Sequence, residues 1–258
     1  MPVRDLYAAF LDALRTASQR ILLLDYDGTL APFRAERHLA VPYPEVPQLL
    51  KKIAAAGTRV VLISGRMARD VASLCGIQPR PEIWGSHGLE RLLSDDSYEV
   101  VPLPEKQLLG LSLAARGLED EGFQKAAERK PGGIALHWRG KPASQVEQFR
   151  EKALKLWEPV AHEYGLRIVE FDGGVEIRSP VRDKGSVVQA ILSEAKPGAT
   201  VAYLGDDQTD EDAFRALKGK GLAILVRPES RATSADLWLQ PPELIEFLKA
   251  WLQVCGEV

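Results

Sequence analysis

Cysteine is scarce in this chain of 258 residues, which contains only Cys75 and Cys255, far apart in the sequence. Two isolated cysteines provide neither the spacing of a zinc site nor a disulfide framework, so we expect a reducing, cytoplasmic location. No apolar run approaches the roughly 18 residues that a membrane span needs, and the first residues lack a signal-peptide core. We therefore expect no membrane partner.

The chain also lacks an excess of basic residues. Lysine and arginine together number 33 against 36 acidic residues, for a formal net charge of -3. Proteins that bind nucleic acids are usually basic, so we expect no nucleic-acid partner. Hydrophobic residues make up 45% and charged residues 27%, which is typical of a globular protein with one large domain or two unequal ones.

Two carboxylates follow the most apolar short stretch of the chain. The aliphatic run Ile21 to Leu24 predicts a strand buried on both faces, and Asp25, Asp27 and Gly28 come directly after it. Open α/β sheets bind ligands outside the carboxyl ends of their strands. Two acids at positions i and i+2 face one side and repel each other, unless a cation such as Mg²⁺ lies between them. A plain Asp-Gly turn is the alternative, but it does not require the first acid.

A second buried strand, Thr58 to Ile63, ends at Ser64 and Gly65. A hydroxyl at a strand end and the backbone amides that open the next helix can bind a phosphate oxygen. The alternative is that Ser64 only caps that helix. Lys184 precedes a glycine at the start of a later helix, where an ammonium group suits a phosphate contact, although such pairs are common by chance.

Five acids fall within seven residues after a third apolar run, Thr200 to Leu204. This density of negative charge at a strand end is costly without a cation. We predict that Asp206 and Asp207 are metal ligands. The acids at positions 210–212 fit a helix N-terminus, where negative charge is favoured, and one of them is a candidate for holding a metal-bound water.

A glycine-framed loop, Gly85 to Glu90, follows another predicted strand. Its glycines would let the loop approach a ligand closely, so we predict binding roles for His87 and Glu90. A lone histidine is usually structural or exposed, and Glu90 could simply be solvated.

The pattern of elements changes near Pro104. A predicted helix over 105–127, strands over 133–138 and 166–171, a helix over 143–164 between them, and a strand over 175–178 form an α+β unit. We predict an α/β fold in which a Rossmann-like parallel-sheet core, 1–104 and 181–258, carries an inserted α+β cap, 105–180. Five polar residues of the cap are candidates for a substrate contact, of which at least two should be merely solvated. They are Glu128, Lys130, Arg139, Glu176 and Arg178.

Taken together, these motifs resemble the haloacid dehalogenase (HAD) superfamily of phosphohydrolases. The segments 25–30, Ser64, Lys184 and 205–207 are similar to its four motifs and occur in the same order. The longer segments 25–32, 64–66, 85–90 and 205–214 look like the trehalose-6-phosphate phosphatase family. The resemblance covers the whole chain, and the cap segment Gly132 to Ile134 departs from the pattern expected after Lys130.

The resemblance implies Mg²⁺-dependent hydrolysis of trehalose 6-phosphate through an aspartyl-phosphate on Asp25, with Asp27 as general acid and then general base. It implies Mg²⁺ ligation by Asp25, Asp206, Asp207 and the backbone carbonyl of Asp27. Ser64, Gly65 and Lys184 would bind the phosphate. The residues implied in substrate binding are Arg66, His87, Glu90, Glu128, Lys130 and Glu176.

Several alternatives stay open at this stage. The substrate could be another sugar phosphate, such as a sucrose or mannosyl phosphate, and Mn²⁺ also suits an all-oxygen site. A silent sugar-phosphate-binding module would have no need of both Asp25 and Asp27, and no residue points to a phosphomutase. We expect a small-molecule partner and a monomer.

Overall fold

The structure is a computed structural model that describes residues 3–34, 36–171 and 173–256. The outermost residues of the predicted core, 1–2 and 257–258, lie outside this range. The chain divides into two compact units. The first unit comprises Met1–Tyr98 and Asp183–Val258, and the second unit comprises Glu99–Arg182. Among the described residues, no helix combines the length and the apolar character needed to cross a bilayer.

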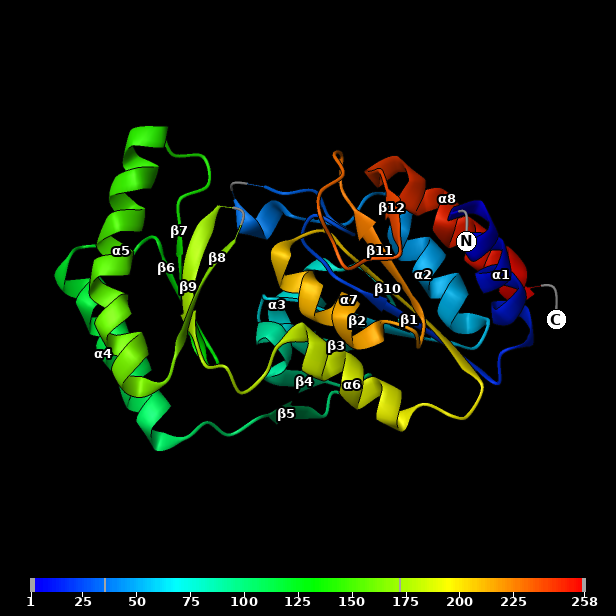
Figure 1. Ribbon diagram of the computed structural model, residues 1–258, viewed down its shortest axis with the longest axis horizontal. Coiled ribbons are helices and arrows are strands. Elements are labelled where there is room, and N and C mark those ends of the chain that lie inside the picture. Colours follow the sequence, from blue (N-terminus) through cyan, green and yellow to red (C-terminus); the bar gives the residue numbers. More distant parts are fainter. Residues whose placement is uncertain (1–2, 35, 172, 257–258) are drawn as a thin grey trace. The chain divides into compact units, whose positions relative to one another are not determined.

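An eight-stranded, mostly parallel sheet forms the centre of the first unit (Figure 1). Strand β1 lies between β10 and β2 and is parallel to both. The pairing of β3 with β4 is antiparallel. In sheet order the strands are β12 (Leu237–Leu239), β11 (Leu222–Val226), β10 (Ala199–Gly205), β1 (Gln19–Leu24), β2 (Thr58–Ile63), β3 (Glu82–Gly85), β4 (Glu90–Leu92) and β5 (Tyr98–Val100). The predicted α/β class with a parallel sheet is confirmed.

Helices cover both faces of this sheet. The helices of one face are α1 (Val3–Thr16), α2 (Val46–Ala55), α3 (Ala68–Leu74) and α8 (Pro241–Gly256), and those of the other are α6 (Lys184–Glu194) and α7 (Glu211–Leu217). Leu22 and Leu24 pack in the first apolar cluster, whereas Ile21 and Leu23 pack in the second. Because side chains alternate along a strand, an unbroken aliphatic run is what a strand buried on both faces requires. A short 3-10 helix, η1 (Arg37–Leu39), lies in the connection between β1 and α2.

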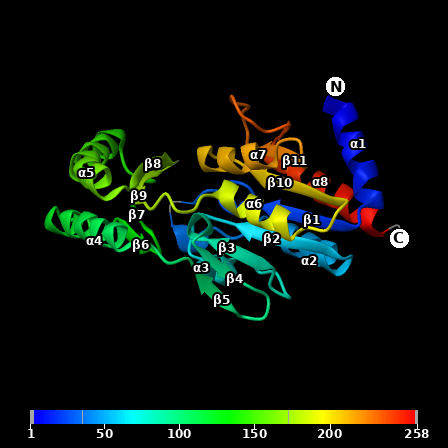
Figure 2. The ribbon, with the colours of Figure 1, turned by 60° about the horizontal axis from the view of Figure 1, so that its bottom comes forward.

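The second unit has an antiparallel sheet with two helices on one side (Figure 2). The strands in order are β6 (Ala127–Lys130), β7 (Gly133–His137), β9 (Gly174–Arg178) and β8 (Arg167–Phe171), and the helices are α4 (Glu105–Asp120) and α5 (Ala143–Tyr164). The predicted helix over 143–164 is confirmed. The predicted helix over 105–127 is wrong beyond Asp120, because the chain turns at Gly122 with a φ of +80° and enters the unpredicted strand β6.

Candidate active site

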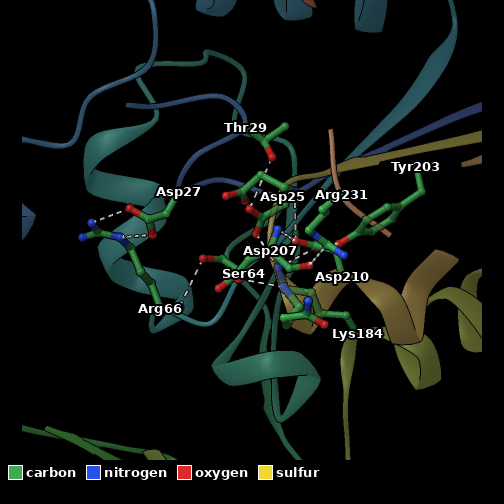
Figure 3. Close-up of polar contacts among 12 residues, drawn as sticks. Asp25, Asp27, Thr29, Ser64, Arg66, Lys184, Tyr203, Asp207, Asp210 and Arg231 are labelled. Carbon is green, nitrogen blue, oxygen red and sulfur yellow. Dashed lines mark hydrogen bonds and ion pairs between the residues drawn. The ribbon is translucent and has the colours of Figure 1, made fainter. Parts of the chain in front are cut away.

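Asp25 lies at the carboxyl end of β1, the central strand of the first unit. Its amide donates to the carbonyl of Leu204 in β10 at 2.8 Å, so the strand pairing itself fixes its backbone. The side chain is only 4% exposed. Lys184 donates to Asp25 Oδ1 at 2.6 Å, and the Thr29 hydroxyl lies 3.5 Å from Oδ2 (Figure 3).

Gly28 allows the loop after β1 to approach the loop after β10. It adopts a φ of +87°, and an added Cβ atom would lie 2.2 Å from Asp206 Oδ2. A side chain at this position would therefore collide with the second acidic motif. The position beside Asp27 is therefore restricted to glycine by this close approach.

Three buried carboxylates converge at the strand ends. Asp25, Asp206 and Asp210 each offer an oxygen within 4.8 Å of the other two. Burial, followed by the neighbouring carboxylates, raises the pKa of Asp206 well above its usual value. Burial raises the pKa of Asp25 to about 7, even though Lys184 opposes the change. A divalent cation would relieve this repulsion.

The donor set of this cluster fits Mg²⁺. All of its side-chain donors are carboxylate oxygens, the ligand type that Mg²⁺ prefers. Asp206 Oδ1 is buried and makes no hydrogen bond to the described residues, so it can accept a cation at no cost in existing contacts. Asp25 and Asp206 are therefore the side chains best placed to hold the ion.

Asp210 belongs to this cluster. The sequence indicated a helix-capping role for it, with one of the acids at 210–212 as a candidate for holding a metal-bound water. It is fully buried, and its Oδ1 accepts from Lys184 at 2.7 Å and from the Tyr203 hydroxyl at 2.5 Å. Its Oδ2 accepts from the backbone amides of Asp206 at 3.1 Å and Asp207 at 3.0 Å. Four hydrogen bonds engage both oxygens, so Asp210 shapes the cluster around it.

Asp207 is placed differently from its neighbour Asp206. Its carboxylate accepts from the amide of Gln208 at 2.7 Å and caps the 3-10 turn η3 (Gln208–Asp210). It is not a member of the group of three converging carboxylates. Its predicted role in metal binding stays a prediction.

Lys184 is the first residue of α6 and is buried between two acids. Asp183 caps this helix through a reciprocal pair of hydrogen bonds with Ser186, which fixes where the lysine enters the site. Burial alone would lower the lysine pKa, but the charges of Asp210 and Asp25 outweigh it and raise the pKa. The ammonium group is therefore charged at neutral pH, as a phosphate contact requires.

Arg66, predicted to bind the substrate, contacts the second acid of the β1 motif. Its Nε donates to Asp27 Oδ2 at 2.6 Å and its Nη2 to Asp27 Oδ1 at 2.7 Å. Its Nη1 donates to the carbonyl of Arg37 at 2.9 Å. This two-pronged pair orients the Asp27 carboxylate, which is 25% exposed and thus open to a reactant.

Ser64, Gly65 and His87 lie together at the ends of β2 and β3. Ser64 Oγ accepts from the amide of Arg66 at 3.1 Å, and the amide of His87 donates to the Ser64 carbonyl at 3.0 Å. An added Cβ at Gly65 would lie 2.7 Å from the His87 ring. The structure therefore brings these three predicted residues into one corner of the site.

Glu90 stabilises the loop that carries His87. Ser86 and His87 adopt left-handed φ values of 48° and 55°, which are unfavourable for residues other than glycine. The buried Glu90 carboxylate accepts from the Ser86 and Tyr98 hydroxyls, the latter at 2.6 Å. Burial, together with this hydrogen bond, raises the pKa of Tyr98 to about 12. These contacts favour a positioning role for Glu90, and its predicted substrate contact stays a prediction.

The three predicted sugar ligands share one face of the sheet in the second unit. Glu128 in β6 and Glu176 in β9 both pair with Ala135 of the strand between them. Lys130 donates to Glu176 Oε2 at 3.0 Å in a buried ion pair, and His137 Nε2 lies 2.9 Å from Glu128 Oε2. The other face carries the apolar residues that pack on α4 and α5. Of the other two predicted candidates, Arg139 lies next to Gly173, and Arg178 is buried.

Comparisons with known proteins agree with this geometry. A sequence model of the family described as trehalose-phosphatase matches residues 23–243. A trehalose-phosphate phosphatase from Mycobacterium marinum is 30% identical over 243 residues, covering 88% of this chain. The structure of Aspergillus fumigatus trehalose-6-phosphate phosphatase is 27% identical, with a TM-score of 0.67 over 97% of both chains. A HAD-superfamily phosphatase from Bacteroides thetaiotaomicron, 18% identical, shares the fold with a TM-score of 0.62 over 93% of this chain and 96% of its own.

The chain spans only part of the length of its curated relatives. The alignment covers 60% of the Mycobacterium marinum protein. It covers 18% of an uncharacterized glycosyl hydrolase from Mycobacterium tuberculosis that is 31% identical over 254 residues. The family match, in contrast, begins in β1 and ends in α8. On this match and the shared HAD fold, the chain belongs to the trehalose-phosphatase family.

Proposed function

We propose that this chain hydrolyses trehalose 6-phosphate to trehalose and phosphate, in a Mg²⁺-dependent reaction through an aspartyl-phosphate on Asp25. The observation that carries the proposal is the buried ammonium of Lys184, held between Asp25 and Asp210 beside the unpartnered oxygen of Asp206. A nucleophilic carboxylate, a fixed cation and a cation-binding acid are the parts that phosphoryl transfer to an aspartate requires.

The proposed reaction has two steps. Asp25 attacks phosphorus, and the bond between phosphorus and the sugar oxygen breaks while Asp27 gives that oxygen a proton. Asp27 then takes a proton from a water molecule that attacks the same phosphorus, which releases phosphate and restores Asp25. The change from general acid to general base follows from the reversal of proton flow between the two steps.

Charge around the transferred group is balanced by residues of the first unit. Lys184 and the Ser64 hydroxyl, with the backbone at Gly65, contact the phosphate oxygens in this proposal. Arg66 holds Asp27 in the orientation needed for proton transfer. Mg²⁺, when bound by Asp25 and Asp206, neutralises negative charge between the nucleophile and the phosphate.

The second unit is proposed to act as the cap that selects the sugar. Glu128, Lys130 and Glu176 offer carboxylates and an ammonium, which hydrogen-bond well to sugar hydroxyls. Their clustering on one sheet face supports the assignment.

The test is phosphate release from a panel of trehalose 6-phosphate, sucrose 6-phosphate, glucose 6-phosphate and an aryl phosphate, with Mg²⁺ and with a chelator. We expect a strong preference for trehalose 6-phosphate that the chelator abolishes. Release from the aryl phosphate alone would keep the phosphatase chemistry but overturn the substrate. If no compound releases phosphate, the alternative of a catalytically silent sugar-phosphate-binding module is favoured.

Gly133 provides a test of the cap that leaves the chemical centre untouched. Gly133 lies in the segment that departs from the family pattern, and an added Cβ would lie 2.4 Å from Glu176 Oε1. Gly133→Ala should therefore displace Glu176 and raise KM for trehalose 6-phosphate by about 10-fold, the scale of one lost polar contact. Steady-state kinetics with trehalose 6-phosphate and with the aryl phosphate measures this effect. The turnover of the aryl phosphate should not change.

Gly117→Ala is the matched control in the same unit. A Cβ at Gly117 in α4 would meet only Leu156, at an ordinary distance of 3.6 Å. Alanine is also the better helix former, so this variant should keep its KM and its stability. Equal KM values for wild type, G133A and G117A would argue against a sugar contact by Glu176.

A further inference from the structure

The segment that joins β11 to β12 contacts the acidic loop after β10. Arg231 Nη2 donates to the carbonyl of Asp207 at 2.9 Å, and Arg227 Nη1 donates to the carbonyl of Asp206 at 3.3 Å (Figure 3 shows Arg231 beside the acidic loop). Asp210, in turn, accepts from the amides of the same two residues. The acidic loop is thus held through both its carbonyl and its amide groups.

Arg231 is itself fixed by Glu211, the first residue of α7. Its Nη1 lies 2.5 Å from Glu211 Oε1. Glu211 also accepts from the Thr233 hydroxyl and the Ser234 amide, both at 2.8 Å, and is buried. Burial would raise the pKa of Glu211, but these donors together outweigh it and lower the pKa. The pair is therefore an ion pair at neutral pH.

This pairing determines what Arg231 can do. Because Glu211 balances its charge, Arg231 adds little net positive charge beside Asp25, Asp206 and Asp210. Its contribution is geometric: it holds the peptide group that follows Asp207, one residue beyond Asp206, and so restricts the loop that carries the Asp206 carboxylate. Residues that orient ligands in this way typically change metal affinity by about 10–100-fold when they are removed.

We propose that Arg231, held by Glu211, is a positioning residue that orients Asp206 for a divalent cation. This inference rests on the proposed cation site and adds a residue pair that contacts neither the ion nor the substrate. Arg227 contributes a longer bond from the same segment. The connection between β11 and β12 is thereby part of the active-site scaffold.

The test is isothermal titration calorimetry of the whole chain with Mg²⁺ alone, together with thermal unfolding in chelator. Arg231→Gln is expected to raise the Mg²⁺ dissociation constant by about 10-fold or more. Arg59→Gln is the matched control, because Arg59, like Arg231, is a largely buried arginine held by carboxylates, here Glu82 and Glu194, each at 2.7 Å, outside the acidic loop. The control should bind Mg²⁺ like wild type.

A second pair of variants separates positioning from stability. Glu211→Gln removes the charged partner of Arg231 and should weaken Mg²⁺ binding in the same direction, which also covers the case in which R231Q does not fold. In an Asp206→Asn background, Arg231→Gln should weaken binding little further, because the ligand that it orients is already gone.

Two results would overturn the inference. If R231Q and E211Q lower only the unfolding temperature and bind Mg²⁺ as tightly as wild type, the pair is merely structural. If wild type itself binds no Mg²⁺, the proposed cation site fails and the inference fails with it. Weaker Mg²⁺ binding in R231Q and E211Q, with wild-type affinity in R59Q, would support both the cation site and the positioning role of Arg231.

Discussion

Asp25→Asn is expected to reduce phosphate release from trehalose 6-phosphate by roughly 10⁴-fold or more, the scale on which loss of a covalent nucleophile acts. An amide cannot form the acyl phosphate, and water has no other activated path to phosphorus in this site. The fold should persist, since Lys184 keeps its second partner, Asp210, at 2.7 Å. Removing one of three buried acids also relieves repulsion in the metal-free protein.

The measurement is single-turnover phosphate release with purified protein, accompanied by circular dichroism to verify the fold. Asp212→Asn is the control: Asp212 belongs to the acidic run after β10, is partly exposed and pairs with Arg215 at 2.5 Å. We expect D212N to react like wild type. Retained turnover in D25N would remove Asp25 from the role of nucleophile.

Lys184→Met is expected to destabilise the metal-free protein by about 3–5 kcal/mol near neutral pH, the cost of breaking a buried ion pair from one side. Methionine fills a similar volume, so the loss is one of charge. Asp25, Asp206 and Asp210 then remain buried together without a cation. Phosphate release should also fall, because the lysine is the fixed positive charge of the site.

The destabilisation should depend on pH in a defined direction. The pKa of Asp25 is raised to about 7 in the folded protein, so its protonated form is favoured there. A raised pKa contributes stability at low pH, below the ordinary value near 3.8, and that stability is lost as pH rises through the folded value. Without Lys184 the pKa rises further, so the variant should be closer to wild type at about pH 5 than at about pH 8.

Urea unfolding in chelator at both pH values measures this difference. The exposed Lys249, which pairs with Glu45 and Glu246, provides the control Lys249→Met, and its stability should follow that of wild type at both pH values. If K184M is less stable than wild type by the same amount at both pH values, Lys184 does not control the protonation of the carboxylates in the cluster.

Local patterns in the sequence were sufficient to predict the central strands of the first unit. The run Ile21 to Leu24 needed no knowledge of its neighbours, because each residue is buried by whichever helix layer lies on its side. The positions of Asp25, Ser64 and Asp206 then follow, since every parallel strand ends at the same edge. The helix over 143–164 was equally local, with a glycine, Gly165, in the left-handed conformation at its end.

The roles of individual acids depend on contacts that the sequence does not reveal. Asp210 has the spacing of a capping residue, and it does accept from the amide of Asp207. Its burial comes from Lys184 and Tyr203, which belong to separate elements. Arg66 was likewise identified as a site residue, but its two-pronged contact with Asp27 depends on how two loops meet.

Strand β6 was missed for a related reason. Its four residues, Ala127 to Lys130, come shortly after α4 and show no apolar alternation of their own. They form a strand because β7 provides a partner for each of them. Pairing with the next strand of the chain, and not intrinsic preference, determines the structure of such a short edge segment.

The position of β1 between β2 and β10 has a consequence for how the protein is made. During synthesis, β1 emerges with β2 soon behind it, but β10 follows only after the whole second unit, Glu99–Arg182, has been translated. The second unit is contiguous, so it can fold before β10 is made. Until then, one edge of the apolar strand β1 is unpaired. An uncovered strand edge is a site for association with other chains. We therefore expect nascent or partly unfolded copies to aggregate through β1, and a chaperone to be needed most at that stage.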